Sequence, residues 1–352
     1  MPMLRVSAVA LAIAVCCFAV LPPALIERND DNLSFDEASK IEILSFAKTI
    51  LSEPFLTREY LAPKLDLKAD QINLESVNKI RFRTLENLLI NYKAAIGDQN
   101  GELPRSTPEA QLKRLTQNFA INNAKEKFYR AYFYEQLRLA ALFPKISSEI
   151  DRFNDNEILG TEFNDRVFYL TYDDGPSDQN GSTDRLIKAL NDRNINAIFF
   201  ALGSAAQKRE NDLADLYKDQ CLASHGWTHI SHAKSVKEAL RSIEQSANLL
   251  NARAHNSYIA AFRPPYGRRL DNSDPFFRDK IKIVLWNIDS QDWQKTISVK
   301  AAADRVLTLM LVWRKGIVLF HDIYDKAEIA LPLIYDRAKR WNISFANCRS
   351  II

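Results

Sequence analysis

Hydrophobic residues follow two different patterns along the chain, and the patterns meet at the polar stretch 154–156. From Ser34 to about residue 144, apolar residues recur at intervals of three and four, which is the spacing of amphipathic helices. After the polar stretch, short apolar runs alternate with amphipathic segments. We therefore predict a small all-helical domain at residues 28–155, followed by an α/β domain at residues 165–352.

Helix start and stop signals divide the first region into three predicted helices. Ser34 and Glu37 have the spacing of a capping box, so the first helix begins there. A second predicted helix stops near Gly97, and a long third helix runs to about Phe143. The aromatic residues between 128 and 134 recur at helical spacing, which is more typical of core packing than of a sugar-stacking surface.

The second region contains short apolar runs of strand length, separated by helical segments. The candidate strands are residues 167–172, 197–202, 221–223, 259–262, 283–286, 317–320 and 343–345. Strands that alternate with helices predict a parallel sheet or barrel.

Composition and charge narrow the class of protein. The 352 residues are 47% hydrophobic and 26% charged, which is typical of a folded protein. The net charge is +3 and the basic residues are dispersed. We therefore expect no nucleic-acid partner.

The first residues have the pattern of an export signal. A charged start from Met1 to Arg5 precedes an uncharged run over residues 6–21, and Pro22 follows. This pattern predicts a secretory signal peptide over residues 1–24, or alternatively an uncleaved N-terminal anchor. The protein is expected to be periplasmic, secreted or anchored at the outer face of the cytoplasmic membrane, with no other membrane contact.

The cysteines leave two alternatives open. Cys16 and Cys17 lie within the predicted signal, so Cys221 and Cys348 would remain after cleavage. In an oxidising compartment these two thiols could pair, and the other interpretation is a pair of small buried apolar side chains.

Candidate chemistry begins with two adjacent carboxylates, Asp173 and Asp174, at the end of a predicted strand. Adjacent carboxylates repel each other, so a site that keeps both usually gives them different tasks. His225 and His229 are four residues apart, a spacing that lets two imidazoles reach one ion. Asp174 with both histidines would form a three-ligand metal site, although Asp174 taken alone could merely cap a turn.

Three further segments supply a cation, an indole and another imidazole. The rigid turn 263–267 begins with Arg263, the segment 289–293 ends in Trp293, and the segment 319–321 ends in His321. Together with residues 171–176 and 225–229, these segments resemble the five motifs of the NodB-type polysaccharide deacetylases, carbohydrate esterase family 4. The resemblance covers residues 165 to 350 and leaves the first 160 residues without an assignment.

The resemblance implies a distorted (β/α)7-type barrel with its site at the carboxyl ends of the strands. It also implies one divalent metal ion held by Asp174, His225 and His229. Zn²⁺ is our first choice, with Co²⁺, Ni²⁺ or Mn²⁺ as alternatives.

Catalytic roles follow from the same resemblance. Asp173 is expected to be the general base and His321 the general acid that protonates the leaving amine. Arg263 is expected to pair with Asp173, and Asp292 to orient His321. No role is assigned to His232, because the family pattern ends at His229.

The substrate-binding residues implied by the resemblance are Tyr266, Trp293 and Leu319. The backbone N–H of Tyr266 would complete an oxyanion hole, while Trp293 and Leu319 would wall a pocket of acetyl size. Two positions depart from the family pattern: Tyr172 stands for a common Phe, and Gly226 stands where Ser or Thr is usual.

The predicted activity is removal of acetyl groups from N-acetylglucosamine units of an extracytoplasmic glycan polymer. Peptidoglycan is the first choice, followed by chitin oligosaccharides, poly-N-acetylglucosamine and acetylxylan. A non-catalytic wall-binding protein is the alternative from another class. A metalloprotease is disfavoured because no Glu follows His225 in the H-E-x-x-H arrangement.

Overall fold

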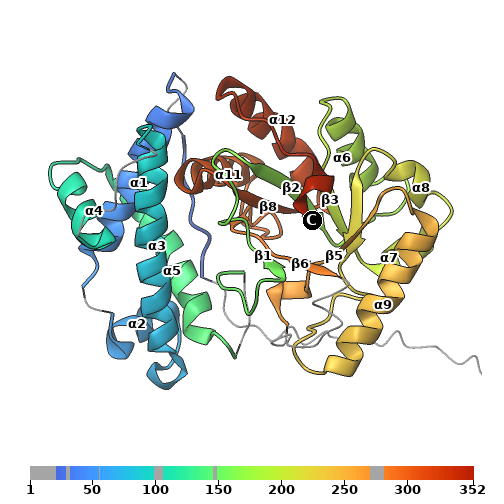
Figure 1. Cartoon of the computed structure of the whole chain (residues 1–352), viewed down its shortest axis with the longest axis horizontal. Coiled ribbons are helices and arrows are strands. Elements are labelled where there is room, and N and C mark those ends of the chain that lie inside the picture. The colour runs from blue at the N-terminus through green and yellow to red at the C-terminus, as the bar shows by residue number, and fades with distance from the viewer. Residues whose placement is uncertain (1–20, 29–31, 55, 99–105, 146–148, 270–280) are drawn as a thin grey trace, which may run out of the picture.

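A helical part and a curled parallel sheet lie side by side in the computed structural model of the chain (Figure 1). It describes all residues except 1–20, 29–31, 55, 99–105, 146–148 and 270–280. The predicted signal segment therefore lies almost entirely outside the described residues, as do Cys16 and Cys17. In the part that is described, no helix is long and apolar enough to span a bilayer.

The described residues of the helical part form five α-helices and a short 3₁₀ turn. These are α1 (Phe35–Ser52), α2 (Arg58–Leu65), η1 (Ala69–Gln71), α3 (Leu74–Ala95), α4 (Pro108–Thr116) and α5 (Asn123–Leu142). The predicted capping box is confirmed: Ser34 Oγ accepts from Glu37 N at 3.3 Å, and Glu37 Oε2 accepts from Ser34 N at 3.0 Å. The prediction of a single long third helix is wrong. Asn122 caps α5 by accepting a hydrogen bond from Lys125 N, so a separate helix begins there.

All strands of the described sheet are parallel, in the order β1-β6-β5-β4-β3-β2-β8-β7. They are β1 (Glu157–Ile158), β2 (Phe168–Asp173), β3 (Ile198–Ala201), β4 (Cys221–Ser224), β5 (Tyr258–Phe262), β6 (Lys282–Val284), β7 (Ile288–Asp289) and β8 (Gly316–His321). The predicted barrel type is confirmed as a curled half-barrel, with eight strands in place of the usual seven. The prediction of a strand at 343–345 is wrong, because in this segment only Phe345 forms a β-bridge, which pairs it with Phe168.

Helices cover the outer face of this sheet, and side chains alternate between its two faces. The helices are α6 (Ser182–Asn191), α7 (Gly203–Lys208), α8 (Leu213–Leu216), α9 (Val236–Arg253), α11 (Val299–Trp313) and α12 (Asp325–Arg340), and two 3₁₀ turns, η2 (Pro265–Gly267) and η3 (Cys348–Ile351), lie at the ends of the sheet. In β8, Ile317 and Leu319 belong to the inner apolar cluster, whereas Val318 and Phe320 belong to the outer one. This period of two is expected for a strand with both faces buried.

The helical part and the sheet share one hydrophobic core. The outer apolar cluster runs from α1, α3 and α5 through α11 to the strands, and the aromatic residues at 128–134 are buried in it, as predicted. Polar contacts join the same surfaces: Trp313 Nε1 donates to Tyr132 Oη at 3.0 Å, and Arg305 pairs with Glu135 at 2.7 Å. The helical part and the sheet thus pack against each other through one apolar cluster, and the domain bounds stay a prediction.

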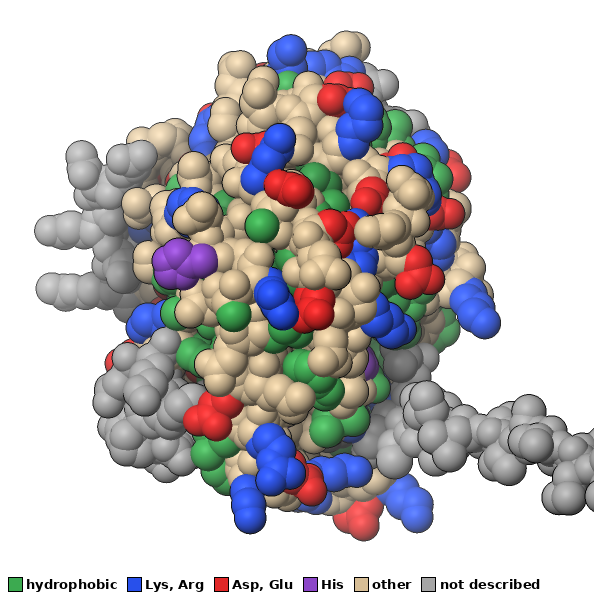
Figure 2. All heavy atoms as spheres, turned by 90° about the vertical axis from the view of Figure 1, so that its right-hand side faces the viewer, with side chains coloured by type: hydrophobic (Ala, Val, Ile, Leu, Met, Phe, Trp, Pro, Cys, Tyr) green, Lys and Arg blue, Asp and Glu red, His purple; other side chains and the backbone are tan. Residues whose placement is uncertain are grey.

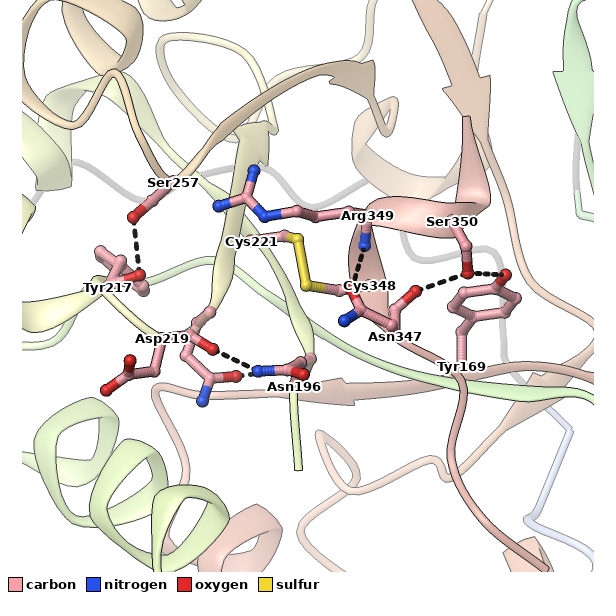
Figure 3. The surroundings of a disulfide bond; sticks show 12 residues. Tyr169, Asn196, Tyr217, Asp219, Cys221, Ser257, Asn347, Cys348, Arg349 and Ser350 are labelled. Atoms are coloured by element: carbon pink, nitrogen blue, oxygen red, sulfur yellow. Dashed lines mark hydrogen bonds between the residues drawn. A yellow bond between two sulfur atoms is a disulfide. The ribbon is translucent and has the colours of Figure 1, made fainter. Parts of the chain in front are cut away.

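A disulfide joins Cys221 to Cys348 and resolves the alternative that the sequence left open (Figure 3). Cys221 is the first residue of β4, so the bond ties η3 to the amino end of the sheet. Beside it, the hydroxyls of Tyr169 and Ser350 are 2.8 Å apart. The C-terminal turn is therefore fixed at the end of the sheet opposite to the predicted site.

Acidic and basic side chains are interspersed on the face of the molecule that Figure 2 shows. This face carries no single-sign stripe of the kind that binds nucleic acid.

Candidate active site

The predicted site residues come together because parallel strands end at one edge of the sheet. Asp173 is the last residue of β2 and His321 the last residue of β8. His225 directly follows β4, and Arg263 directly follows β5. These four side chains are far apart in the sequence, yet their strands are joined through neighbouring pairs in the sheet.

Asp174, His225 and His229 form a cluster with the geometry of a metal site. Their ligand atoms lie within 4.8 Å of one another. Asp174 Oδ1 is 3.4 Å from His225 Nε2 and 3.4 Å from His229 Nε2. His225 Nδ1 lies 2.7 Å from the carbonyl oxygen of Arg263, so this nitrogen carries the proton and leaves a lone pair on Nε2.

The donor set fits a divalent cation. Asp174 Oδ1 is buried and has no hydrogen-bond partner among the described residues. Burial raises the pKa of Asp174, but its close interaction with His225 outweighs burial, so the pKa of this carboxyl lies well below its usual range. Burial lowers the pKa of His229, which favours the neutral ring that can ligate a metal. The carboxylate oxygen and the two imidazole nitrogens all offer lone pairs, and a divalent cation would accept all three.

Asp173 has different partners from those of Asp174. Its Oδ1 accepts a hydrogen bond of 2.8 Å from Arg263 Nη1, and both side chains are buried. The guanidinium also donates to Thr171 Oγ1 at 2.8 Å, to the Val284 carbonyl at 3.0 Å and to the Leu285 carbonyl at 2.8 Å. Arg263 is therefore held by three fixed acceptors besides Asp173, and it presents that carboxylate in one orientation.

His321 is paired with a buried carboxylate. Its Nδ1 lies 2.8 Å from Asp292 Oδ1, and its backbone N–H donates to Asp292 Oδ2 at 2.9 Å. Ser290 Oγ donates to the same carboxylate at 3.1 Å. Although burial lowers the pKa of His321, the charge of Asp292 and its hydrogen bond raise it to about 10. The imidazole is thus cationic near neutral pH and carries a proton that it can donate.

The three predicted substrate-binding residues differ in exposure. Tyr266 is 51% exposed with φ of 61°, and its ring centroid lies 4.4 Å from that of His229. Trp293 is 37% exposed, whereas Leu319 is 2% exposed and belongs to the inner apolar cluster. Tyr266 thus borders the metal cluster, Trp293 is open to solvent, and their roles remain predictions.

The structure explains the departure from the family pattern at Gly226. This residue has φ of 84°, and a Cβ added there would lie 2.8 Å from His232 Cε1. The ring of His232 is buried against Phe262, at 5.4 Å between centroids. His232, to which the sequence assigned no role, therefore occupies the space that a side chain at position 226 would need.

The sequence also missed Asp322, which directly follows His321. Its carboxylate is buried and accepts hydrogen bonds from Gly175 N and Thr183 Oγ1. The sequence shows only that Asp322 is a second ionisable residue at the end of a buried strand. Its hydrogen-bond partners could not be inferred from that position.

A cavity of about 290 Å³ lies away from this cluster. Residues of α3, α5 and α11 line it, together with Trp286 and Asp289. None of the three metal-ligand candidates contributes to its wall, so this cavity is not the reaction site.

Comparison with known proteins finds similarity in the same region. Residues 160–279 match the polysaccharide deacetylase family, a segment that contains the first three motifs and ends before the last two. A Bacillus cereus peptidoglycan-N-acetylglucosamine deacetylase is 31% identical over 149 residues, which are 41% of this chain and 52% of the relative. The chain therefore spans about half the length of that relative.

Two further comparisons cover a similar part of the chain. A chitooligosaccharide deacetylase from Rhizobium leguminosarum bv. trifolii is 29% identical over 171 residues, covering 47% of this chain and 75% of the relative. The crystal structure of a peptidoglycan N-acetylglucosamine deacetylase superposes with a TM-score of 0.50 at 25% identity. That superposition covers 56% of this chain and 92% of the other.

Proposed function

We propose that the chain, whose residues 160–279 match the polysaccharide deacetylase family, is a metal-dependent N-deacetylase acting on N-acetylglucosamine residues of an extracytoplasmic polysaccharide. The observation that carries the proposal is the convergence of a partnerless, buried Asp174 oxygen with the Nε2 atoms of His225 and His229. Beside this cluster lie a carboxylate fixed by an arginine and an imidazole fixed by a carboxylate.

The metal ligands in this proposal are Asp174, His225 and His229, and Zn²⁺ suits a carboxylate with two imidazoles. The chemistry that such a cation supplies is that of a Lewis acid, which favours the attack of water on an amide carbonyl. Three protein ligands leave coordination positions open, as catalytic sites require.

Two residues move protons in the proposed reaction. Asp173 accepts a proton from the attacking water, since Arg263 holds it as an oriented carboxylate. His321 donates its proton to the nitrogen of the leaving sugar amine, which is then released as the free amine with acetate as the other product. Asp292 stabilises the cationic form of His321 before that transfer.

Peptidoglycan is the substrate that we propose first. The Bacillus cereus relative is named for this activity, while the Rhizobium relative is named for chitooligosaccharides. Export would bring the enzyme to the cell wall, and the Cys221–Cys348 disulfide supports an oxidising compartment outside the cytoplasm. Trp293 and Leu319 are proposed to wall the acetyl pocket, and Tyr266 to donate its backbone N–H to the oxyanion.

An acetate-release panel tests this function. Full-length protein is incubated with peptidoglycan fragments, chitin oligomers, poly-N-acetylglucosamine and acetylxylan, beside Asp173→Asn and the exposed control Asp215→Asn. We expect acetate and free amines from an N-acetylglucosamine polymer with wild type and control, and little from Asp173→Asn.

Two other outcomes of the panel would contradict the proposal. Release from acetylxylan alone would identify an esterase instead. Binding to the polymers without release would identify a non-catalytic wall-binding protein.

A further inference from the structure

Asp322 is a buried carboxylate beside the site, although it is neither a metal ligand nor a proton carrier in the proposed mechanism. It is 1% exposed and directly follows His321 at the end of β8. Among the described residues it forms no ion pair with lysine or arginine. Burial raises the pKa of Asp322 to about 7, a direction that the negative charge of Asp174 reinforces. An unpaired carboxylate in this position costs stability, which is typical of residues kept for function.

Hydrogen bonds join Asp322 to the last residue of β2, to the loop that follows β2 and to the start of α6. Its Oδ1 accepts from Gly175 N at 2.9 Å, and its Oδ2 accepts from Thr183 Oγ1 at 2.7 Å. Its backbone N–H donates to the Asp173 carbonyl at 3.2 Å, and its own carbonyl accepts from Ser182 Oγ at 2.6 Å. The residue after the proposed acid is therefore bound to residues on both sides of Asp174.

The loop held in this way has a conformation that Asp174 does not adopt freely. Asp174 has φ of 80°, in the left-handed region that costs free energy for residues other than glycine. Its N–H donates to the Phe200 carbonyl at 3.2 Å on one side, and the bond from Gly175 to Asp322 fixes the other. A Cβ on Gly175 would lie 1.9 Å from Asp322 Oδ2, so the close approach requires glycine.

We propose that Asp322 is the positioning residue that holds the metal ligand Asp174 and the base Asp173 in register with the acid His321. The inference rests on the proposed function for the roles of those three residues. In this proposal Asp322 positions the site through its hydrogen bonds and not through its charge. An asparagine, which has the same shape and can keep those bonds, should therefore preserve the function of the residue.

The test compares Asp322→Ala with Asp322→Asn in the full-length chain. The asparagine can accept from Gly175 N through its oxygen and donate to Thr183 Oγ1 through its nitrogen. Asp325→Ala is the matched control, because its carboxylate is 69% exposed and its partner Arg185 is on the surface. Co²⁺ affinity is measured by titration of the metal-free protein, and kcat, KM and the unfolding temperature are measured beside it.

We expect Asp322→Ala to weaken Co²⁺ binding by about 10- to 100-fold, the range found when residues that orient metal ligands are removed. Its kcat should fall while KM changes little. Asp322→Asn should restore both Co²⁺ affinity and kcat to within a few-fold of wild type, and Asp325→Ala should equal wild type. Should Asp322→Ala fail to fold, Thr183→Val removes one of the same bonds and should show a smaller loss of Co²⁺ affinity.

Two results would overturn the inference. One is wild-type Co²⁺ affinity in Asp322→Ala or, where that variant does not fold, in Thr183→Val. The other is an Asp322→Asn as defective as the alanine variant. Because Co²⁺ binding needs no substrate, a wild type that binds Co²⁺ but releases no acetate contradicts the proposed function and leaves this comparison valid.

Discussion

At the scale of single residues, the two adjacent aspartates differ because their neighbours differ. Asp173 faces a guanidinium, and Asp174 faces two imidazoles. The sequence could predict that the two carboxylates have separate tasks, since both lie at a strand end beside recognisable motifs. It could not predict the acceptors that hold Arg263 or the hydrogen bonds of Asp322, because these join backbone groups from distant strands.

The division of labour between the carboxylates predicts two classes of variant. Asp173→Asn should retain metal, because it changes no ligand, and should lose roughly 100- to 10,000-fold in turnover, the usual contribution of a general base. His229→Ala should lose metal as well as activity. Metal content per chain separates the classes, and equal metal loss in both variants would show that the assignment of the carboxylates is wrong.

The pairing of His321 with Asp292 predicts the alkaline side of the pH profile. The pKa of His321 is raised to about 10, so the acid is protonated at neutral pH and activity falls as pH rises through that pKa. A bound cation lowers the pKa by repulsion, so the descending limb should lie at or below that value. Asp292→Asn removes the stabilising charge and should move this limb to lower pH in a kcat profile. An unmoved limb would exclude His321 as the acid.

At the scale of elements, strong hydrophobic runs were predictable and short ones were not. The strands β2, β3, β4, β5, β6 and β8 fall within a residue or two of their predicted positions. The two-residue strands β1 and β7 are too short for any periodicity, and they form by pairing at the two edges of the sheet. The break between α4 and α5 likewise depends on a side-chain cap, which apolar spacing does not reveal.

The turn after β4 provides a prediction for one element. Gly226→Ser should destabilise the fold by about 1–3 kcal/mol, because a residue with a Cβ is strained at φ of 84° and meets the ring of His232. The double variant Gly226→Ser, His232→Ala should recover part of this loss, since it removes the collision and leaves the backbone strain. Denaturant unfolding of wild type, single and double variants measures both effects, and a single variant as stable as wild type would contradict this account.

At the scale of the whole molecule, the helical part completes the core of the sheet. The sequence indicated a change of pattern and suggested two domains. We predict that removal of residues up to about 155 affects stability or polymer preference more than chemistry. The structure supplies a physical reason for the effect on stability, since α1 and α3 pack against α11 and Tyr132 of α5 bonds to Trp313 of α11. Such tertiary packing cannot be inferred from helical periodicity. The periodicity shows which face of a helix is buried but not which element packs against that face.

The buried pair Glu135–Arg305 tests this shared core directly. Glu135→Ala leaves Arg305 buried without its partner and should destabilise the chain by about 3–5 kcal/mol. The control Glu126→Ala breaks an exposed pair with Arg130 and should cost about 0–1 kcal/mol. Denaturant unfolding should show one transition for the helical part and the sheet together. Two separate transitions, with Glu135→Ala affecting neither, would contradict a common core.

The most direct test of the central claim is acetate release from N-acetylglucosamine oligomers before and after the metal is removed. The protein is stripped with a chelator, its metal content is measured, and Zn²⁺ is then added back in stoichiometric amount. The account predicts that activity disappears with the metal held by Asp174, His225 and His229 and returns with Zn²⁺. Undiminished acetate release from protein shown to contain no metal would contradict it.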